Sequence, residues 1–234
     1  MFTTIFYQPI LNLFIFIYNL VPGGDIGWAV LAFTVLIKAV LWPVSGRALK
    51  SQKALQSLQP KIDELKKQHA GNKEVMTKEM MALYKQEKIN PLSSCLPLLI
   101  QLPFLWAIFR VFRDELGGQI SGLIYSFIHN PGQLNSLAFS LLDFSKPNIP
   151  LAILAGAAQF VQAKMLPMAK PAIKSDGSKD ENMAAMMNKQ MVYIFPVLTV
   201  VICLSLPSGL AFYWFLTTLL TIGQQMLVFK KDKQ

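Results

Sequence analysis

The sequence predicts an all-α integral membrane protein: a five-transmembrane-helix core with an N-terminal interfacial helix and a cytoplasmic helical hairpin. Apolar residues make up 53% of the 234 residues and lie in long blocks separated by charged segments. Several blocks reach the roughly 20 residues that an α-helix needs to cross a bilayer. The net charge of +9 comes from basic residues in the loops beside these blocks, where they act as topology signals rather than as a surface for nucleic acid.

Five segments have the length and composition of a membrane span. They are residues 26–45, 92–112, 149–167, 190–206 and 209–229. Pro43 is expected to stop the first span, and Pro97 and Pro103 to bend the second, because each proline removes a backbone donor. Only residues 207–209 separate the last two spans. A connection this short forces them into an antiparallel helical hairpin.

The segment before the first span, residues 2–20, has two interpretations. Its apolar content is sufficient for a span, but four residues interrupt it: Gln8, Pro9, Asn12 and Asn19. We expect a helix that lies in the membrane interface and joins the first span through the turn-forming sequence VPGGD at 21–25. A sixth span is the alternative.

Basic residues are distributed unevenly among the loops. Residues 47–90 hold ten Lys or Arg, residues 168–189 hold four and the tail after residue 229 holds three, whereas the loop 114–148 holds only Lys146. The positive-inside rule therefore places the C-terminus in the cytoplasm and the N-terminus outside. One charged cluster at the outer end of the second span departs from the rule, but its charges cancel: Arg110, Arg113, Asp114 and Glu115.

Residues 47–90 form the largest polar region and are expected to fold as a helical hairpin. Apolar residues recur at helical spacing on both sides of a turn signal at 70–72: Leu55, Leu58, Ile62 and Leu65 before it, and Met76, Met80 and Leu83 after it. The two apolar stripes would face each other or the membrane. The basic faces would attract anionic lipid headgroups or ribosomal RNA, and a merely solvated spacer is the alternative. The chain then divides into residues 1–25, 26–46, 47–90 and 91–234.

Lys38 is a charged residue inside the first span, twelve residues after Ile26. A charge at the bilayer centre costs about 2.5–3.5 kcal/mol on insertion scales. Lys38 therefore either snorkels to the cytoplasmic headgroups or faces a water-filled cavity within the helix bundle. Polar residues on four spans favour the cavity: Thr34, Gln101, Gln159, Gln162, Tyr213, Thr217, Thr221 and Gln224.

This polar site lacks the groups that catalysis requires. The expected spans contain no Asp, Glu or His to act as a general acid or base, and no metal-ligand cluster or phosphate-binding loop has a useful spacing. We therefore expect neither an enzyme nor a cofactor. A coupled transporter would be expected to carry an intramembrane carboxylate and an inverted repeat, and neither is evident in the sequence. The pattern favours a site that receives a ligand over one that reacts or pumps.

Four stretches of the chain are similar to one known family, the YidC/Oxa/Alb membrane protein insertases. They are LQPKIDELKK at 58–67, EMMALYKQEKINPL at 79–92, CLPLLIQLP at 95–103 and LPSGLAFYWF at 206–215, the last followed by Gln224 and Gln225. The resemblance extends from about residue 7 to residue 229. It implies a multi-pass protein of the bacterial inner membrane, with a five-helix core whose groove is open to the cytoplasm and to lipid and sealed on the outer side.

The resemblance also implies roles for individual residues. Lys38 falls at the position of the family's positive groove residue, where arginine is usual and stays charged more firmly than lysine. Thr34 matches a position near the passing substrate, and Gln162 matches a polar groove position. Tyr213 and Trp214 match aromatic positions of the last helix. The hairpin is similar to one implicated in receiving substrate, and the basic tail resembles a short form of a ribosome-contacting end. The large outer domain of some Gram-negative members has no counterpart in this sequence.

The expected function is therefore membrane protein insertion without a covalent step. Nascent membrane proteins are the expected substrates, and the ribosome, the Sec translocon and anionic lipids are further expected partners. Two other interpretations are open. One is a transporter or channel that uses Lys38 as an anion site, and the other is a chaperone that folds substrates already inserted by a translocon.

Overall fold

The chain folds as a bundle of helices, as the sequence predicts. The structure, a computed structural model, describes residues 3–69, 72–90, 96–116, 118, 120, 122–165 and 190–231. Its helices are α1 (Gln8–Leu20), α2 (Ile26–Ser57), α3 (Gln59–Gln68), α4 (Lys73–Gln86), α5 (Leu96–Arg110), α6 (Ile149–Met165), α8 (Phe195–Leu204) and α9 (Ser208–Lys231). Shorter helical turns are η1 (Thr3–Tyr7), η2 (Pro22–Gly24), η4 (Val111–Glu115) and η5 (Gln190–Ile194), and two short antiparallel strands are β1 (Leu137–Ala138) and β2 (Leu142–Asp143).

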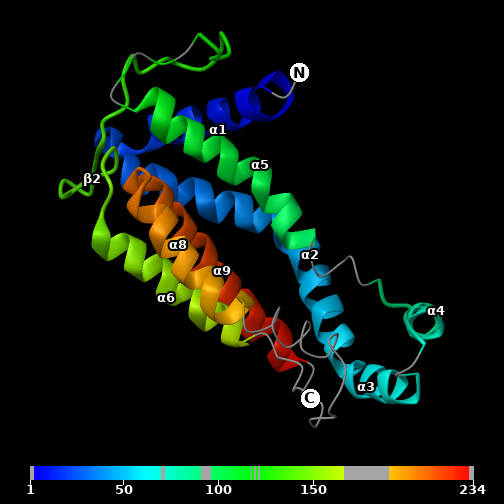
Figure 1. Ribbon diagram of the computed structural model, residues 1–234. Coiled ribbons are helices and arrows are strands. Elements are labelled where there is room, and N and C mark those ends of the chain that lie inside the picture. The colour runs from blue at the N-terminus through cyan, green and yellow to red at the C-terminus, as the bar shows by residue number, and fades with distance from the viewer. Residues whose placement is uncertain are drawn as a thin grey trace.

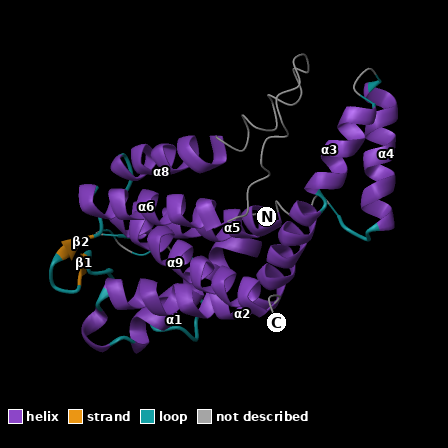
Figure 2. Cartoon of the chain, turned by 90° about the horizontal axis from the view of Figure 1, so that it is seen from below, coloured by secondary structure: helices purple, strands orange, loops and turns teal. Residues whose placement is uncertain are grey.

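The long helices lie side by side and give the bundle two distinct ends. Figure 1 shows β1 and β2 at one end, and α3, α4 and the C-terminal end of α9 at the other. Helix α6 packs against both α8 and α9, and Figure 2 shows it between them. The chain reverses direction between Leu204 and Ser208, which confirms the expected hairpin of the last two spans. Below, the two ends are called the β-sheet end and the α3–α4 end.

Each predicted span corresponds to a helix. Within the described residues, three segments are long and apolar enough to cross a membrane, Thr3–Leu20, Ile26–Leu55 and Ser208–Phe229. Two shorter apolar helices are Ile149–Met165 and Val192–Leu204. Helix α5 continues directly into η4, so this helical stretch reaches from Leu96 to Glu115; residues 92–95 of the predicted span, like residues 166–189, lie outside the described residues. Because length and hydropathy allow the first segment to span, its placement in the interface stays a prediction.

Helix α2 differs from the prediction, because it does not stop at Pro43. It continues through this proline to Ser57, and its 32 residues correspond to a length of about 48 Å. A proline inside a helix removes one hydrogen bond, and the regular turns on both sides of Pro43 hold the helix together. Since the apolar layer is roughly 30 Å thick, α2 extends well beyond it. The segment 47–57, assigned to the hairpin from the sequence, belongs to α2.

The hairpin itself is formed by α3 and α4, which pack against each other. Asn72 caps α4, its side chain accepting a hydrogen bond from the Val75 backbone N–H at 3.2 Å. The Lys61 ammonium lies 2.6 Å from the Glu87 carboxylate and joins the far ends of the two helices. On α3, Leu58 and Ile62 are buried, as their helical spacing predicts. Helix α3 ends at Gln68 and α4 begins at Lys73, on the two sides of the turn predicted at 70–72; residues 70 and 71 lie outside the described residues.

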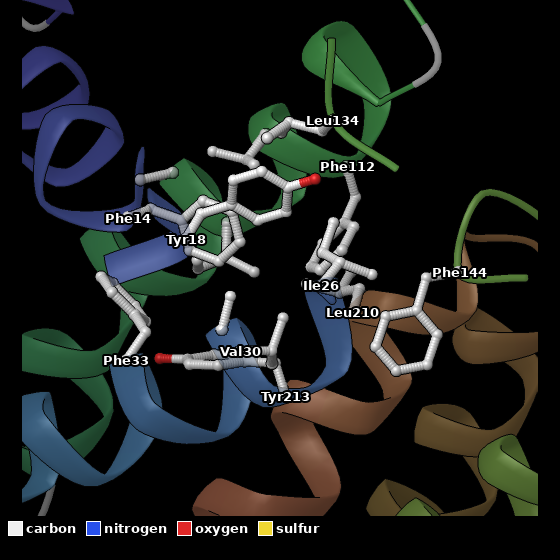
Figure 3. Close-up of a cluster of buried hydrophobic side chains, with 14 of the residues drawn as sticks. Phe14, Tyr18, Ile26, Val30, Phe33, Phe112, Leu134, Phe144, Leu210 and Tyr213 are labelled. Atoms are coloured by element: carbon white, nitrogen blue, oxygen red, sulfur yellow. The ribbon is translucent and has the colours of Figure 1, made fainter. Parts of the chain in front are cut away.

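An apolar core occupies the β-sheet end of the bundle. Figure 3 shows side chains from α1, α2, η4, α9 and the segment before α6 converging there. Its aromatic rings meet edge to face, with centroids 5.8 Å apart for Phe14 and Phe33 and 6.1 Å apart for Phe112 and Phe144. Such pairs add about 0.5–1.5 kcal/mol beyond the area they bury. This end of the bundle is therefore closed by close packing.

The polar residues of α1 serve to hold the connection between η4 and α6. Asn12 is buried; its Nδ2 donates to the Leu123 carbonyl at 2.9 Å, and its Oδ1 accepts from the Tyr125 N–H at 2.7 Å. Asn19 Nδ2 donates to the His129 carbonyl at 2.7 Å. The side chains of α1 that face outward include Phe16 and Leu20, 50% and 67% exposed. Asn12 is thus directed into the protein, and Asn19, although exposed, also holds this connection.

The charged cluster at the end of α5 is internally paired. The Asp114 carboxylate lies 2.9 Å from Arg110 Nε and 2.6 Å from Arg113 Nε, and the hydrogen bond from Arg113 lowers the pKa of Asp114. Glu115 is buried and accepts a hydrogen bond from the Tyr7 hydroxyl at 2.8 Å. The predicted local neutralisation of these charges is confirmed, and the cluster joins α5 to the start of α1.

Replacing Asp25 with alanine is expected to lower the free energy of unfolding by about 2 kcal/mol. Its Oδ1 accepts the Gly27 N–H at 2.7 Å and so caps α2, while its Oδ2 accepts the Phe139 N–H at 2.7 Å. Phe139 has a φ of +53°, a left-handed conformation that needs support from its surroundings. Unfolding in detergent measures the loss. Asp25→Asn, which keeps one acceptor, should be intermediate, and an unchanged stability of Asp25→Ala would contradict this account.

Candidate functional site

Lys38 lies within the bundle and contacts α9. It is partly buried, twelve residues after the start of α2, or about 18 Å along the helix. Its Nζ donates a hydrogen bond of 2.7 Å to the Thr221 hydroxyl, which in turn donates to the Thr217 carbonyl at 2.7 Å. The ammonium group is therefore held on α9 by a neutral hydroxyl, which leaves its positive charge available to a ligand.

A small cavity of about 30 Å³ adjoins Lys38. Residues of α2 and α5 line it: Lys38, Leu41, Val44, Ser45, Ala48, Ile100 and Gln101. A volume of this size has room for a water molecule, and the lining offers the polar partners that such a molecule needs. The cavity lies between α2 and the first half of α5, on the side of Lys38 that faces the α3–α4 end.

Gln101 and Tyr213 connect α5 to α9. The Gln101 Nε2 donates to the Tyr213 hydroxyl at 2.5 Å. Tyr213 is buried, so its ring packs in the apolar core while its hydroxyl reaches the polar site. This tyrosine marks the boundary between the closed β-sheet end and the polar region around Lys38.

Gln224 makes a second connection between α9 and α2. Its Nε2 donates to the Trp42 carbonyl at 3.0 Å, and its Oε1 accepts from the Ser45 hydroxyl at 3.0 Å. Ser45, the last residue of the expected span 26–45, was not recognised from the sequence as a member of the site. Its position could have revealed it, since a residue seven after Lys38 lies two turns further along the same helix face.

The hydrogen bonds of Lys38 do not reach the other residues that the sequence analysis expected in the groove. Thr34 is buried, and its hydroxyl donates to the Val30 carbonyl of its own helix at 2.6 Å. Gln159 accepts a hydrogen bond from Thr199 of α8, so it belongs to the contact between α6 and α8. Gln162 and Trp214 are partly buried on α6 and α9. The hydrogen bonds of Lys38, Gln101, Tyr213, Thr221 and Gln224 thus connect α2, α5 and α9, with the Thr217 carbonyl as a further acceptor. Those of Thr34 and Gln159 lie within α2 and between α6 and α8.

The arrangement is suited to holding a polar or anionic group. It combines one cation with hydroxyl and amide groups in the middle of apolar helices. Across the part of the chain that the structure describes, no three His, Cys, Asp or Glu side chains come together as a metal site would require. A binding site for an acidic segment is the chemistry that these residues support.

Ser45 and Gln224 are expected to stabilise the contact between α2 and α9 by direct coupling. Hydrogen bonds between helices within membranes contribute about 0.6 kcal/mol on average and at most about 1.7 kcal/mol. A double-mutant cycle of Ser45→Ala and Gln224→Ala, measured by unfolding in detergent, should give a coupling energy in this range. Additive effects of the two substitutions would show that the bond adds nothing to stability.

The fold and this site define a helical, multi-pass membrane protein whose core helices enclose a polar, cationic site. Residues 16–234 match the family described as 60Kd inner membrane protein. The chain belongs to this family, whose curated relatives are named membrane protein insertase YidC. Proteins of this family are located in the bacterial inner membrane. The resemblance drawn from the sequence is confirmed.

Individual relatives cover the chain almost completely. The membrane protein insertase YidC of Fusobacterium nucleatum is 35% identical over 89% of this chain and 88% of its own length. That of Pelobacter propionicus is 33% identical over 97% of this chain but only 39% of its own length, and that of Streptomyces avermitilis is 28% identical over 92% and 55%. The chain is thus similar to nearly the whole of the first relative and to about half or less of the other two.

Proposed function

We propose that this chain is a membrane protein insertase that receives a nascent polypeptide in a polar groove and releases its apolar segment into the bilayer. The observation that carries the proposal is the position of Lys38, a cation inside the apolar bundle whose hydrogen-bond partner is the neutral Thr221 hydroxyl. The family membership supports the same function.

The proposed mechanism needs no covalent step. Lys38 attracts acidic residues in the polar tail of the substrate, and the amide and hydroxyl groups around it replace part of the water that the tail gives up. The apolar segment of the substrate moves along the lipid-facing sides of α5 and α9, where Leu102 and Leu219 are exposed. Transfer of apolar surface out of water, at about 25 cal/mol per Å², provides the driving force.

The orientation and the further partners belong to the same proposal. We place the α3–α4 end in the cytoplasm and the N-terminus outside, because the basic segment 47–90 lies at that end. Arg47 and Lys50 are exposed on the part of α2 that extends beyond the apolar layer, a position suited to anionic headgroups. The basic hairpin and tail would contact the ribosome, and cooperation with the Sec translocon is compatible with this arrangement.

Reconstitution tests the function directly. Purified protein in liposomes should insert a short-tailed membrane protein, detected as protease protection of its apolar segment, whereas protein-free liposomes should not. The same vesicles should show little anion flux. Strong flux without insertion would favour the alternative of a transporter or channel with Lys38 as its anion site. Insertion that occurs only when a translocon is added would favour a chaperone role.

A further inference from the structure

Helix α5 consists of two halves with different packing, and Pro103 separates them. Among the described side chains of α5 and η4, those that are buried all follow this proline: Ala107, Ile108, Val111, Phe112 and Glu115. Before it, Leu99 and Leu102 are 57% and 47% exposed. The second half is thus part of the apolar core, whereas the described side chains before Pro103, residues 99–102, are exposed or only partly buried.

The second half of α5 is also fixed by specific contacts. Phe112 lies so close to α9 that a Cβ atom at Gly209 would come within 2.2 Å of its ring. The Tyr7 hydroxyl holds Glu115, and the Arg110 guanidinium stacks 4.4 Å from the centroid of the Tyr7 ring. Contacts with two other helices therefore prevent this half from moving independently.

The described side chains of the first half of α5, residues 99–102, are held to the other helices by fewer specific contacts. Among the described residues, its side-chain connection to α9 is the hydrogen bond from Gln101 to Tyr213. Toward α2, Ile100 and Gln101 border the cavity beside Lys38 rather than a filled contact. Pro103 has no N–H to donate to the Leu99 carbonyl, so the helix lacks one hydrogen bond at the junction and bends there more readily than elsewhere.

In contrast to α2 and the first half of α5, helices α2 and α9 are held together along their contact. Three hydrogen bonds cross it, from Lys38 to Thr221, from Ser45 to Gln224 and from Gln224 to the Trp42 carbonyl. Further toward the α3–α4 end, the Lys53 ammonium lies 5.9 Å from the centroid of the Phe229 ring. The side of Lys38 that faces α5 is therefore easier to open than the side that faces α9.

We propose that the polypeptide reaches Lys38 between α2 and the first half of α5, which turns about Pro103 while α2 and α9 stay together. The inference rests on the proposed function and adds the route to the site. The partner is an extended polypeptide segment with an acidic side chain, which pairs with Lys38. Val44 and Leu99, exposed on the two sides of the route, would contact its aliphatic parts.

Two cross-links distinguish this route from others. The parent for both experiments carries Cys95→Ser and Cys203→Ser. One variant of this parent joins α2 to α5 through Ala48→Cys and Ile100→Cys. A second, matched variant joins α2 to α9 through Lys53→Cys and Phe229→Cys. Both are closed with a short, reducible bifunctional thiol reagent. The α2–α5 link should reduce insertion to the level of protein-free liposomes, and reduction should restore it. The α2–α9 link should leave insertion unchanged.

The outcomes separate the route from the function. Insertion that survives the α2–α5 link, or that is lost with the α2–α9 link, overturns the proposed route while the activity before cross-linking still supports the function. If the Cys95→Ser, Cys203→Ser parent is folded but inserts no substrate, this result contradicts the proposed function instead.

The bend at Pro103 is tested separately, by replacing this proline and a control proline with alanine. Pro103→Ala restores the missing donor and should slow insertion several-fold without lowering thermal stability. Pro150→Ala is the matched control, because Pro150 is the second residue of α6, which is capped by Asn148 just before it, and a proline in the first turn of a helix removes no internal hydrogen bond. The expectation from sequence that Pro97 also bends this helix stays a prediction, because residues 91–95 before it lie outside the described residues. Unchanged insertion by Pro103→Ala would overturn the hinge.

Discussion

Replacement of Lys38 with glutamate is expected to abolish insertion of substrates that carry acidic tails. The substitution exchanges an attraction for a repulsion, and each is worth up to about 4 kcal/mol for charges 4 Å apart at an effective dielectric constant of 20. Lys38→Met removes the attraction alone and should have a smaller effect. Lys38→Arg keeps the charge and should be tolerated, since either cation can pair with a carboxylate.

The measurement is protease protection of the substrate in liposomes that contain each variant at equal density. A charge-reversed substrate provides the control: with lysines in place of its acidic residues, it should be inserted better by Lys38→Glu than by the parent. If Lys38→Glu inserted the acidic substrate as well as the parent does, electrostatic attraction by Lys38 would be ruled out as part of the mechanism.

Replacement of Gly209 with valine is expected to cause a large loss of stability. A Cβ atom at this position would lie 2.2 Å from Phe112 Cε1 and 2.5 Å from its Cζ, and Phe112 is itself buried in the core that closes the β-sheet end. Overpacking of a core costs about 1–3 kcal/mol and occasionally more. The upper part of this range is expected here, because the valine methyl groups enlarge the clash and the ring has little space to move.

Gly223 on the same helix is the matched control for Gly209. A Cβ atom at Gly223 would meet no atom within 4 Å, so Gly223→Ala should leave stability unchanged or raise it by up to about 1 kcal/mol through helix propensity. Thermal unfolding in detergent micelles compares both variants with the parent. Equal stability of Gly209→Val and Gly223→Ala would contradict the close packing of Phe112 against α9.

The helices of this protein follow from local sequence patterns. Apolar blocks of sufficient length predict each helix that corresponds to a span, and the sequence between Leu20 and Ile26 predicts the turn, where Gly23 and Gly24 have φ values of +75° and +61°. Hydropathy and glycine conformations depend on neighbours in the chain, so they can be recognised without knowledge of the fold.

The sequence-based predictions were wrong or incomplete where the role of a residue depends on contacts between helices. Pro43 was expected to stop the first span, but α2 continues to Ser57, and residues on both sides of this proline bond to Gln224 of α9. Gln159 was grouped with Lys38 by its polarity, and this stays a prediction; the partner that the structure gives it is Thr199 on α8. Polarity predicts that a side chain inside a bundle needs a partner, but not which helix supplies it.

By itself, the sequence determined the class of protein, the positions of the spans, the hairpins and the presence of a cation at Lys38. Only the tertiary structure decided the partners of that cation. Lys38 and Thr221 are 183 residues apart in the chain and 2.7 Å apart in space, and no local pattern specifies such a pair. Their contact depends on how the helices pack around the core at the β-sheet end, and the same packing leaves the first half of α5 at the surface.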